Sequence, residues 1–160
     1  MYFAILEDKL YEILEKEHIV YRDLVQILKE EKNAIMDDDI ERLNALIIEG
    51  KEKISKIEFL ENERVKLLSS HLGIKTINEI IEVIPPEKKE KFIQIKVNLL
   101  TEIEKVKNLK AINELLINKT LRYIHFYLEL LSKETGPSTY KETGLLSYNE
   151  NSLNKLDERV

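Results

Sequence analysis

Hydrophobic side chains recur every three or four positions through most of the chain, which is the spacing of one face of an α-helix. The pattern predicts three long helices, over about 1–36, 39–72 and 86–133. Their apolar stripes are Leu6, Leu10, Ile13, Tyr21, Leu24 and Leu28 in the first; Ile40, Leu43, Ile47, Ile54, Ile57, Leu60, Leu67 and Leu68 in the second; and Phe92, Ile95, Leu99, Ile103, Val106, Leu109 and Leu116 in the third.

Helix boundary signals agree with these stripes. The acidic run 37–39 predicts a turn, in which Asp38 caps the second helix and Glu41 completes a capping box. Gly73 directly follows Leu72 and is typical of the residue that ends a helix. Two further signals delimit a short fourth helix: a capping box over Thr76, Ile77, Asn78 and Glu79 starts it, and Pro85 and Pro86 stop it.

Composition narrows the fold class to all-α. The 160 residues include only four glycines and three prolines, too few for a β-sandwich or a glycine-rich phosphate loop. The absence of cysteine excludes disulfide scaffolds and Cys-ligated metal sites. We therefore expect an elongated antiparallel bundle or coiled coil of three long helices and one short one over residues 1–135. Residues 136–160, which begin with the breaker Gly136-Pro137, are predicted to form a flexible C-terminal tail.

Charge and hydropathy exclude two classes of partner. The formal net charge is −5, and no cluster of Lys and Arg marks a nucleic-acid surface. No stretch approaches the roughly 18 uncharged apolar residues that membrane insertion requires. No basic region precedes Glu7, the first acidic residue of the chain. The first residues therefore do not match a signal peptide. We expect the cytoplasm as the compartment.

The sequence offers little for catalysis. A di-metal helical bundle uses two Glu-x-x-His motifs, and the chain has one, at Glu15-Lys16-Glu17-His18; a solvated helix face explains it better. No serine or cysteine lies in a nucleophile motif. We expect no enzyme activity, no cofactor and no metal. Glu17 and Asn113 interrupt apolar stripes, and we interpret them as residues that set helix register or mark a solvated gap.

The most informative segment is 121–131, where 8 of 11 residues are apolar, against 9 of 24 in 87–110. A bundle helix needs only about three apolar positions in seven, so this segment has a surplus. Three interpretations remain open: it is central in the bundle under both other helices and the tail, it is a homodimer face, or it binds an apolar segment of another protein. For the last, we expect the binding surface around Leu121, Ile124, Tyr127, Leu128 and Leu131.

The tail carries one further pattern. Ser152 can cap a short helix in which Leu153, Leu156 and Val160 lie on one face. We expect this amphipathic segment to fold on a partner.

The chain resembles the FlgN family of flagellar export chaperones. On the first two helices the resemblance rests on Glu17-x-x-x-Tyr21-x-x-Leu24 and on Glu61-x-x-Arg64-x-x-Leu67-Leu68. Its most specific part is the stretch 112–124, similar to the family's Asn-x-x-Leu-Leu-x-x-Ser-Leu, with Thr120 in place of Ser. Tyr140-Lys141-Glu142-Thr143-Gly144 and the ending at 152–157 are also similar. One departure is Lys110, where many members carry a second Asn.

The resemblance implies a cytoplasmic chaperone of type III secretion. Such proteins bind the C-terminal segments of hook-associated proteins, keep them unassembled and deliver them to the flagellar export gate. The resemblance also implicates Tyr140 and Gly144 of the tail in partner and gate contacts. The main alternative is a coiled-coil scaffold or tether without an export role, and the second is the di-metal bundle enzyme.

Overall fold

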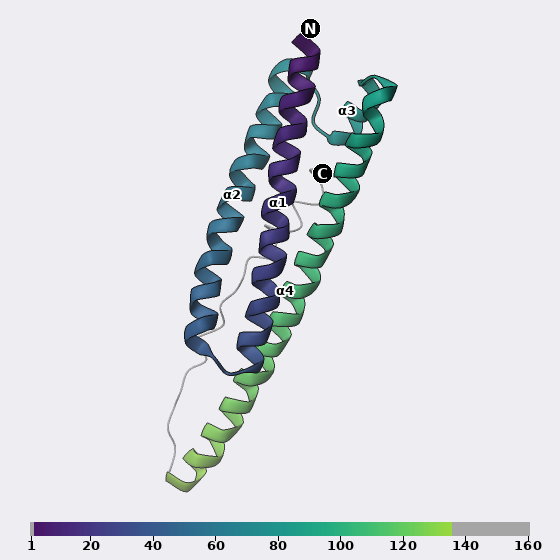
Figure 1. Ribbon diagram of the computed structural model, residues 1–160. Coiled ribbons are helices and arrows are strands. Elements are labelled where there is room, and N and C mark those ends of the chain that lie inside the picture. Colours follow the sequence, from purple (N-terminus) through teal and green to yellow (C-terminus); the bar gives the residue numbers. More distant parts are fainter. Residues whose placement is uncertain (1, 136–160) are drawn as a thin grey trace.

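A computed structural model describes residues 2–135 of the chain. It contains four helices, α1 (Tyr2–Met36), α2 (Ile40–Leu72), α3 (Ile77–Val83) and α4 (Pro86–Thr135), joined by short connections (Figure 1). The predicted all-α class, three long helices and one short helix are therefore confirmed. The predicted tail, residues 136–160, lies outside the described residues.

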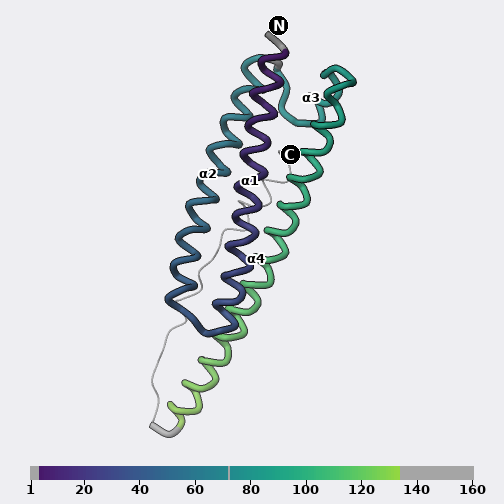
Figure 2. The backbone as a smooth tube through the Cα atoms, viewed as in Figure 1, coloured from purple at the N-terminus to yellow at the C-terminus, as the bar shows by residue number. Residues whose placement is uncertain are grey.

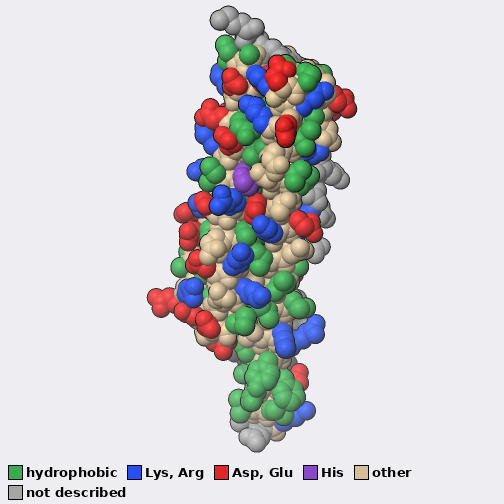
Figure 3. All heavy atoms as spheres, turned by 45° about the vertical axis from the view of Figure 1, so that its right-hand side comes forward, with side chains coloured by type: hydrophobic (Ala, Val, Ile, Leu, Met, Phe, Trp, Pro, Cys, Tyr) green, Lys and Arg blue, Asp and Glu red, His purple; other side chains and the backbone are tan. Residues whose placement is uncertain are grey.

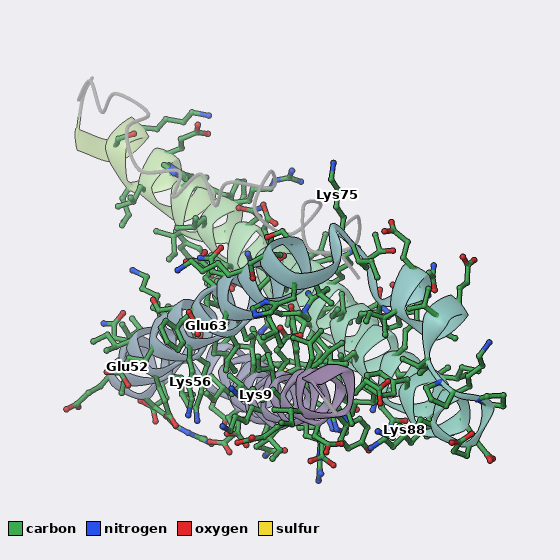
Figure 4. The ribbon with its side chains drawn as sticks, turned by 90° about the horizontal axis from the view of Figure 1, so that it is seen from above. Lys9, Glu52, Lys56, Glu63, Lys75 and Lys88 are labelled. Carbon is green, nitrogen blue, oxygen red and sulfur yellow. The ribbon has the colours of Figure 1, made fainter. Side chains whose placement is uncertain are left out.

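Helix α1 lies between the other two long helices. It packs along α2 on one side and along α4 on the other, whereas α2 and α4 have no close backbone approach (Figures 1 and 2). Successive long helices reverse direction, so α1 and α2 are antiparallel and α1 and α4 run parallel. Residue pairs show the parallel register: the Tyr11 and Phe92 rings pack edge to face, and Asn113 reaches Leu28. The view along the bundle places the N-terminal end of α4, with Lys88, beside α1 (Figure 4).

The core follows the predicted stripes closely. All the residues of the third stripe from Phe92 to Val106 are buried, as are five of the six in the first, with Ile13 half-buried. The second stripe needs one correction: Ile40 is 70% exposed, and Leu46 is buried at the α1 contact instead. Ile40 is the first residue of α2, and the first residues of this helix to pack against Ile27 and Ala34 of α1 are Leu43 and Leu46, about one and two turns later.

The helix ends confirm most boundary predictions. Gly73 adopts a left-handed φ of 63°, and the side chain of Thr76 accepts a hydrogen bond from the Glu79 backbone N–H. Pro86 opens α4 as its first residue, where its missing N–H is not needed. The predicted cap at Asp38 is wrong by one residue: Asp39 accepts from the Arg42 backbone N–H at 3.0 Å, because Asp38 takes the left-handed φ of 55° that closes the turn.

A buried ion pair occupies the place where Glu17 interrupts the first stripe. The Arg64 Nε of α2 donates to the Glu17 Oε1 of α1 at 3.0 Å, and both side chains are at most 2% exposed. Burial raises the pKa of Glu17, and Arg64 acts against that rise. The neighbouring carboxylate of Glu61, which is also buried, adds a smaller increase to the same pKa. The interpretation of Glu17 as a register-setting residue fits this specific pairing between two helices.

Candidate functional site

Helix α4 continues beyond the end of the α1–α2 hairpin. Asn113 lies level with Leu28, and α1 ends eight residues later at Met36, so parallel α1 reaches only to about residue 121 of α4. We call residues 121–135 the overhang. At 1.5 Å per residue it is about 20 Å long. Figure 1 shows it as the light green end that projects past the turn between α1 and α2.

The overhang presents large apolar side chains to its surroundings around most of its circumference. Its exposed hydrophobic residues are Tyr123, Ile124, Phe126, Tyr127, Leu128, Leu130 and Leu131, each between 45% and 61% exposed. Figure 3 shows them as a nearly continuous hydrophobic surface at this end, whereas charged side chains interrupt the apolar ones over the rest of the visible face. Arg122, His125 and Glu129 form the narrow polar stripe along it.

This exposure bears on the first of the three interpretations of 121–131. The segment does not lie at the centre of the bundle under the two other long helices, so that part of the first interpretation is wrong. The reason is the length of α1, which is too short to accompany α4 to its end. Cover by the tail lies outside the described residues. A homodimer face and a surface for another protein both require exposed apolar area, and both remain open.

Three aromatic rings pack against one another on one side of the overhang. The rings of Tyr123 and Tyr127 pack edge to face at 4.9 Å between centroids, and Phe126 packs against Tyr127 at 6.3 Å. The Tyr123 hydroxyl donates to the Tyr127 hydroxyl at 3.3 Å, which raises the pKa of Tyr123. Aromatic side chains are enriched in the centres of protein interfaces because they bury much area with little loss of rotamer freedom.

A polar group of residues lies at the base of the overhang. The Asn113 side chain is buried and donates from Nδ2 to the Leu28 carbonyl at 2.9 Å, which ties α4 to α1 about two turns before α1 ends. Nearby, burial raises the pKa of Glu31, and Asn113 and Lys110 act against that rise. Burial also lowers the pKa of the Lys110 ammonium, opposed by Glu114 and Glu31.

Neither a metal cluster nor a membrane-spanning helix occurs in the part of the chain that the structure describes. Among residues 2–135, no three His, Asp or Glu side chains converge in a way that could hold a metal ion. His18, from the single Glu-x-x-His match, is half-buried, and burial lowers its pKa. None of the described helices combines the length and the apolar character needed to cross a bilayer.

The structure brings together five of the predicted site residues. Leu121, Ile124, Tyr127, Leu128 and Leu131 all lie on the overhang, with Leu121 half-buried at its base. Tyr140 and Gly144 lie outside the described residues. The prediction omitted Tyr123, Phe126 and Leu130, which are as exposed as the others. Their signal was present in the sequence, because a segment with 8 apolar residues in 11 exposes more than one face.

Comparison with known proteins connects this architecture to one family. The model of the FlgN protein family matches residues 1–148, which includes all four helices and extends past Tyr140 and Gly144. No curated protein and no solved structure matches the chain.

Proposed function

We propose, because this chain belongs to the FlgN family of flagellar export chaperones, that it binds the C-terminal segments of hook-associated proteins and delivers them to the flagellar export gate. The single observation that supports this proposal is the overhang, an exposed apolar helix end on an otherwise ordinary bundle. A subunit awaiting secretion keeps apolar segments unassembled, and these need a partner that shields them from water.

The size of the exposed surface is sufficient for such a partner. A large side chain presents on the order of 150–200 Å² when fully exposed, so seven at about half exposure leave roughly 600 Å² uncovered. This is at the upper end of the roughly 300–600 Å² found for the largest apolar patch on a monomer. It also approaches the roughly 800 Å² that each partner contributes to a standard protein interface.

The arrangement of the surface favours a helical client that lies against more than one side. Within 121–131, apolar residues leave only the narrow stripe of Arg122, His125 and Glu129 polar, so a single straight helix would cover one face and leave another exposed. A client segment that wraps around the overhang, or supplies two short helices, buries both. Amphipathic helices recognise such surfaces through apolar residues spaced three and four apart.

The client test uses a pair of substitutions on the overhang and a matched pair on the bundle. Ile124→Asp with Leu128→Asp changes two neighbouring apolar residues that are 48% and 54% exposed. Ile93→Asp with Val97→Asp makes the same change, at the same spacing on α4, at residues that are 48% and 50% exposed. Titration calorimetry with a C-terminal peptide of a hook-associated protein should show about a 100-fold or greater loss of affinity for the first pair alone.

Circular dichroism and light scattering complete this test. Both variants should keep the helicity of the unmodified chain, because all four residues are exposed. Unchanged peptide affinity in the Ile124 and Leu128 variant would contradict the proposal. If that variant instead converts a dimer into a monomer while peptide binding persists, the overhang is a homodimer face.

Delivery to the export gate forms the second part of the proposal and rests on the resemblance at Tyr140 and Gly144. Tyr140→Ala should leave peptide affinity within about twofold, since Tyr140 is separate from the overhang in sequence, but should reduce secretion of hook-associated proteins in a flagellated host. Secretion at the normal level in that variant would remove Tyr140 from this part of the proposal.

A further inference from the structure

We infer that residues 152–160 of this same chain occupy one face of the overhang whenever no other protein is bound there, and so act as an internal competitor. The inference concerns the surface used in the proposed function but does not require that the client be a hook-associated protein. Three observations carry it: the exposed apolar face, the place where α4 ends, and the pattern of the remaining residues.

The chain continues from the tip of the overhang itself. Helix α4 ends at Thr135, and Gly136-Pro137 follows at once, a pair that stops a helix and favours a change of direction. Residues 136–151 then connect α4 to Ser152. A coil of this length spans on average roughly 20–25 Å, close to the overhang length of about 20 Å. Effective concentration is highest when the mean span of a connection matches the distance between sites.

The segment 152–160 has an apolar face that is suited to pack against the apolar surface of the overhang. Its apolar residues, Leu153, Leu156 and Val160, share one helical face, and Ser152 is a suitable cap. As a helix, nine residues are about 13 Å long, so they cover only part of the overhang. A second face therefore stays open, which lets a client bind first and displace the segment afterwards.

Thiol cross-linking tests the placement on the full chain, which has no cysteine of its own. His125→Cys on the overhang with Asn154→Cys should form an intramolecular disulfide under mild oxidation, at a rate independent of protein concentration. The matched control is the same cysteine pair in a chain that also carries Leu153→Asp and Leu156→Asp, because the two cysteines keep their separation along the chain while the apolar face of the segment is lost. The pair without the two aspartates should react about tenfold faster than this control.

A functional test uses Leu153→Asp with Leu156→Asp, and Asn151→Asp with Asn154→Asp as the control that adds the same charge to polar positions. The leucine variant should bind more of a dye that reports exposed apolar surface. It should also bind any overhang client about three- to tenfold more tightly, because less of the surface is occupied beforehand.

Each other outcome overturns the inference. Equal disulfide rates with and without the two aspartates would place the segment elsewhere, and disulfide-linked dimers would make a second copy the occupant. Dye binding equal in the two aspartate variants would show that the leucines do not cover the overhang. Failure of the peptide experiments on hook-associated proteins leaves the cross-linking result unaffected, so the two proposals fail separately.

Discussion

Replacing Arg64 by methionine should destabilise this bundle far more than removing an exposed charge, because Glu17 would remain buried without its cation. Arg64 is 1% exposed and Glu17 is 2% exposed, and each comes from a different helix. Removing one partner of such a pair costs about 3–5 kcal/mol of unfolding free energy. Methionine retains much of the aliphatic volume of arginine, so a cavity contributes little to this loss.

The loss should depend on pH in a definite direction. Burial raises the pKa of Glu17 above the ordinary value of 4.5 for a glutamate, and Arg64 opposes that rise, so the pKa rises further in the variant. A carboxyl whose pKa is higher in the folded state favours folding at low pH, and this contribution is lost as pH increases through the folded pKa. The deficit of the variant should therefore be larger at pH 7.5 than at pH 4.5.

Urea denaturation followed by circular dichroism at these two pH values measures the effect. Glu17→Gln in the Arg64→Met background should recover most of the stability at pH 7.5, because it removes the uncompensated charge. Glu61→Gln is added in a third variant, since Glu61 is buried nearby and also raises the pKa of Glu17. Lys16→Met, which breaks the exposed pair with Glu12, is the control and should change stability by less than about 1 kcal/mol.

Two results would refute this reasoning. If the Arg64→Met variant lost the same unfolding free energy at both pH values, the loss would come from packing rather than from the charge of Glu17. Failure of both glutamine substitutions to restore stability at pH 7.5 would lead to the same conclusion.

Three smaller changes test the rest of the bundle in the same denaturation assay. Gly50→Ala should stabilise by about 0.5–1 kcal/mol, because the added Cβ would meet its nearest neighbour at 3.5 Å, an ordinary contact, and a loss would show that the helices cannot accept it. Asn113→Ala should cost about 1–2 kcal/mol through the lost bond to Leu28, and no cost would make that bond dispensable. Thr76→Ala should cost about 1 kcal/mol by removing the cap at Glu79, with unchanged stability as the contrary result.

Much of the fold could be predicted from the sequence because local signals and helix period agree. Gly73, Thr76 and Pro86 each ended or began a helix where their backbone chemistry requires it. The stripe from Phe92 to Val106 is buried throughout, since a long helix packed on one side needs apolar residues every three or four positions. The errors were at the turn, where Asp38 and Asp39 are equally good caps by type, and only the backbone path distinguishes them.

The candidate site was predicted only in part, for a reason that lies in the relation between helices. The density of apolar residues in 121–131 showed a surplus of apolar surface, but density alone does not say whether other helices cover it. The answer depends on where α1 ends relative to α4, and that register is fixed by contacts such as the one between Asn113 and Leu28. Such contacts join residues that are distant in sequence, and hydrophobic period does not determine them.

The separation between bundle and overhang would let one helix serve both the stability of the bundle and the proposed binding of a client. The large core cluster extends along α4 only from Phe92 to Val106, and Asn113 is the last buried residue of that helix. Beyond it, no side chain of the overhang that the structure describes is fully buried, so changes there cost little folding energy. The apolar residues of the overhang therefore contribute little to holding the bundle together, and the proposed binding role would explain their presence. This is why paired aspartates at Ile124 and Leu128 should remove binding and leave the helices intact.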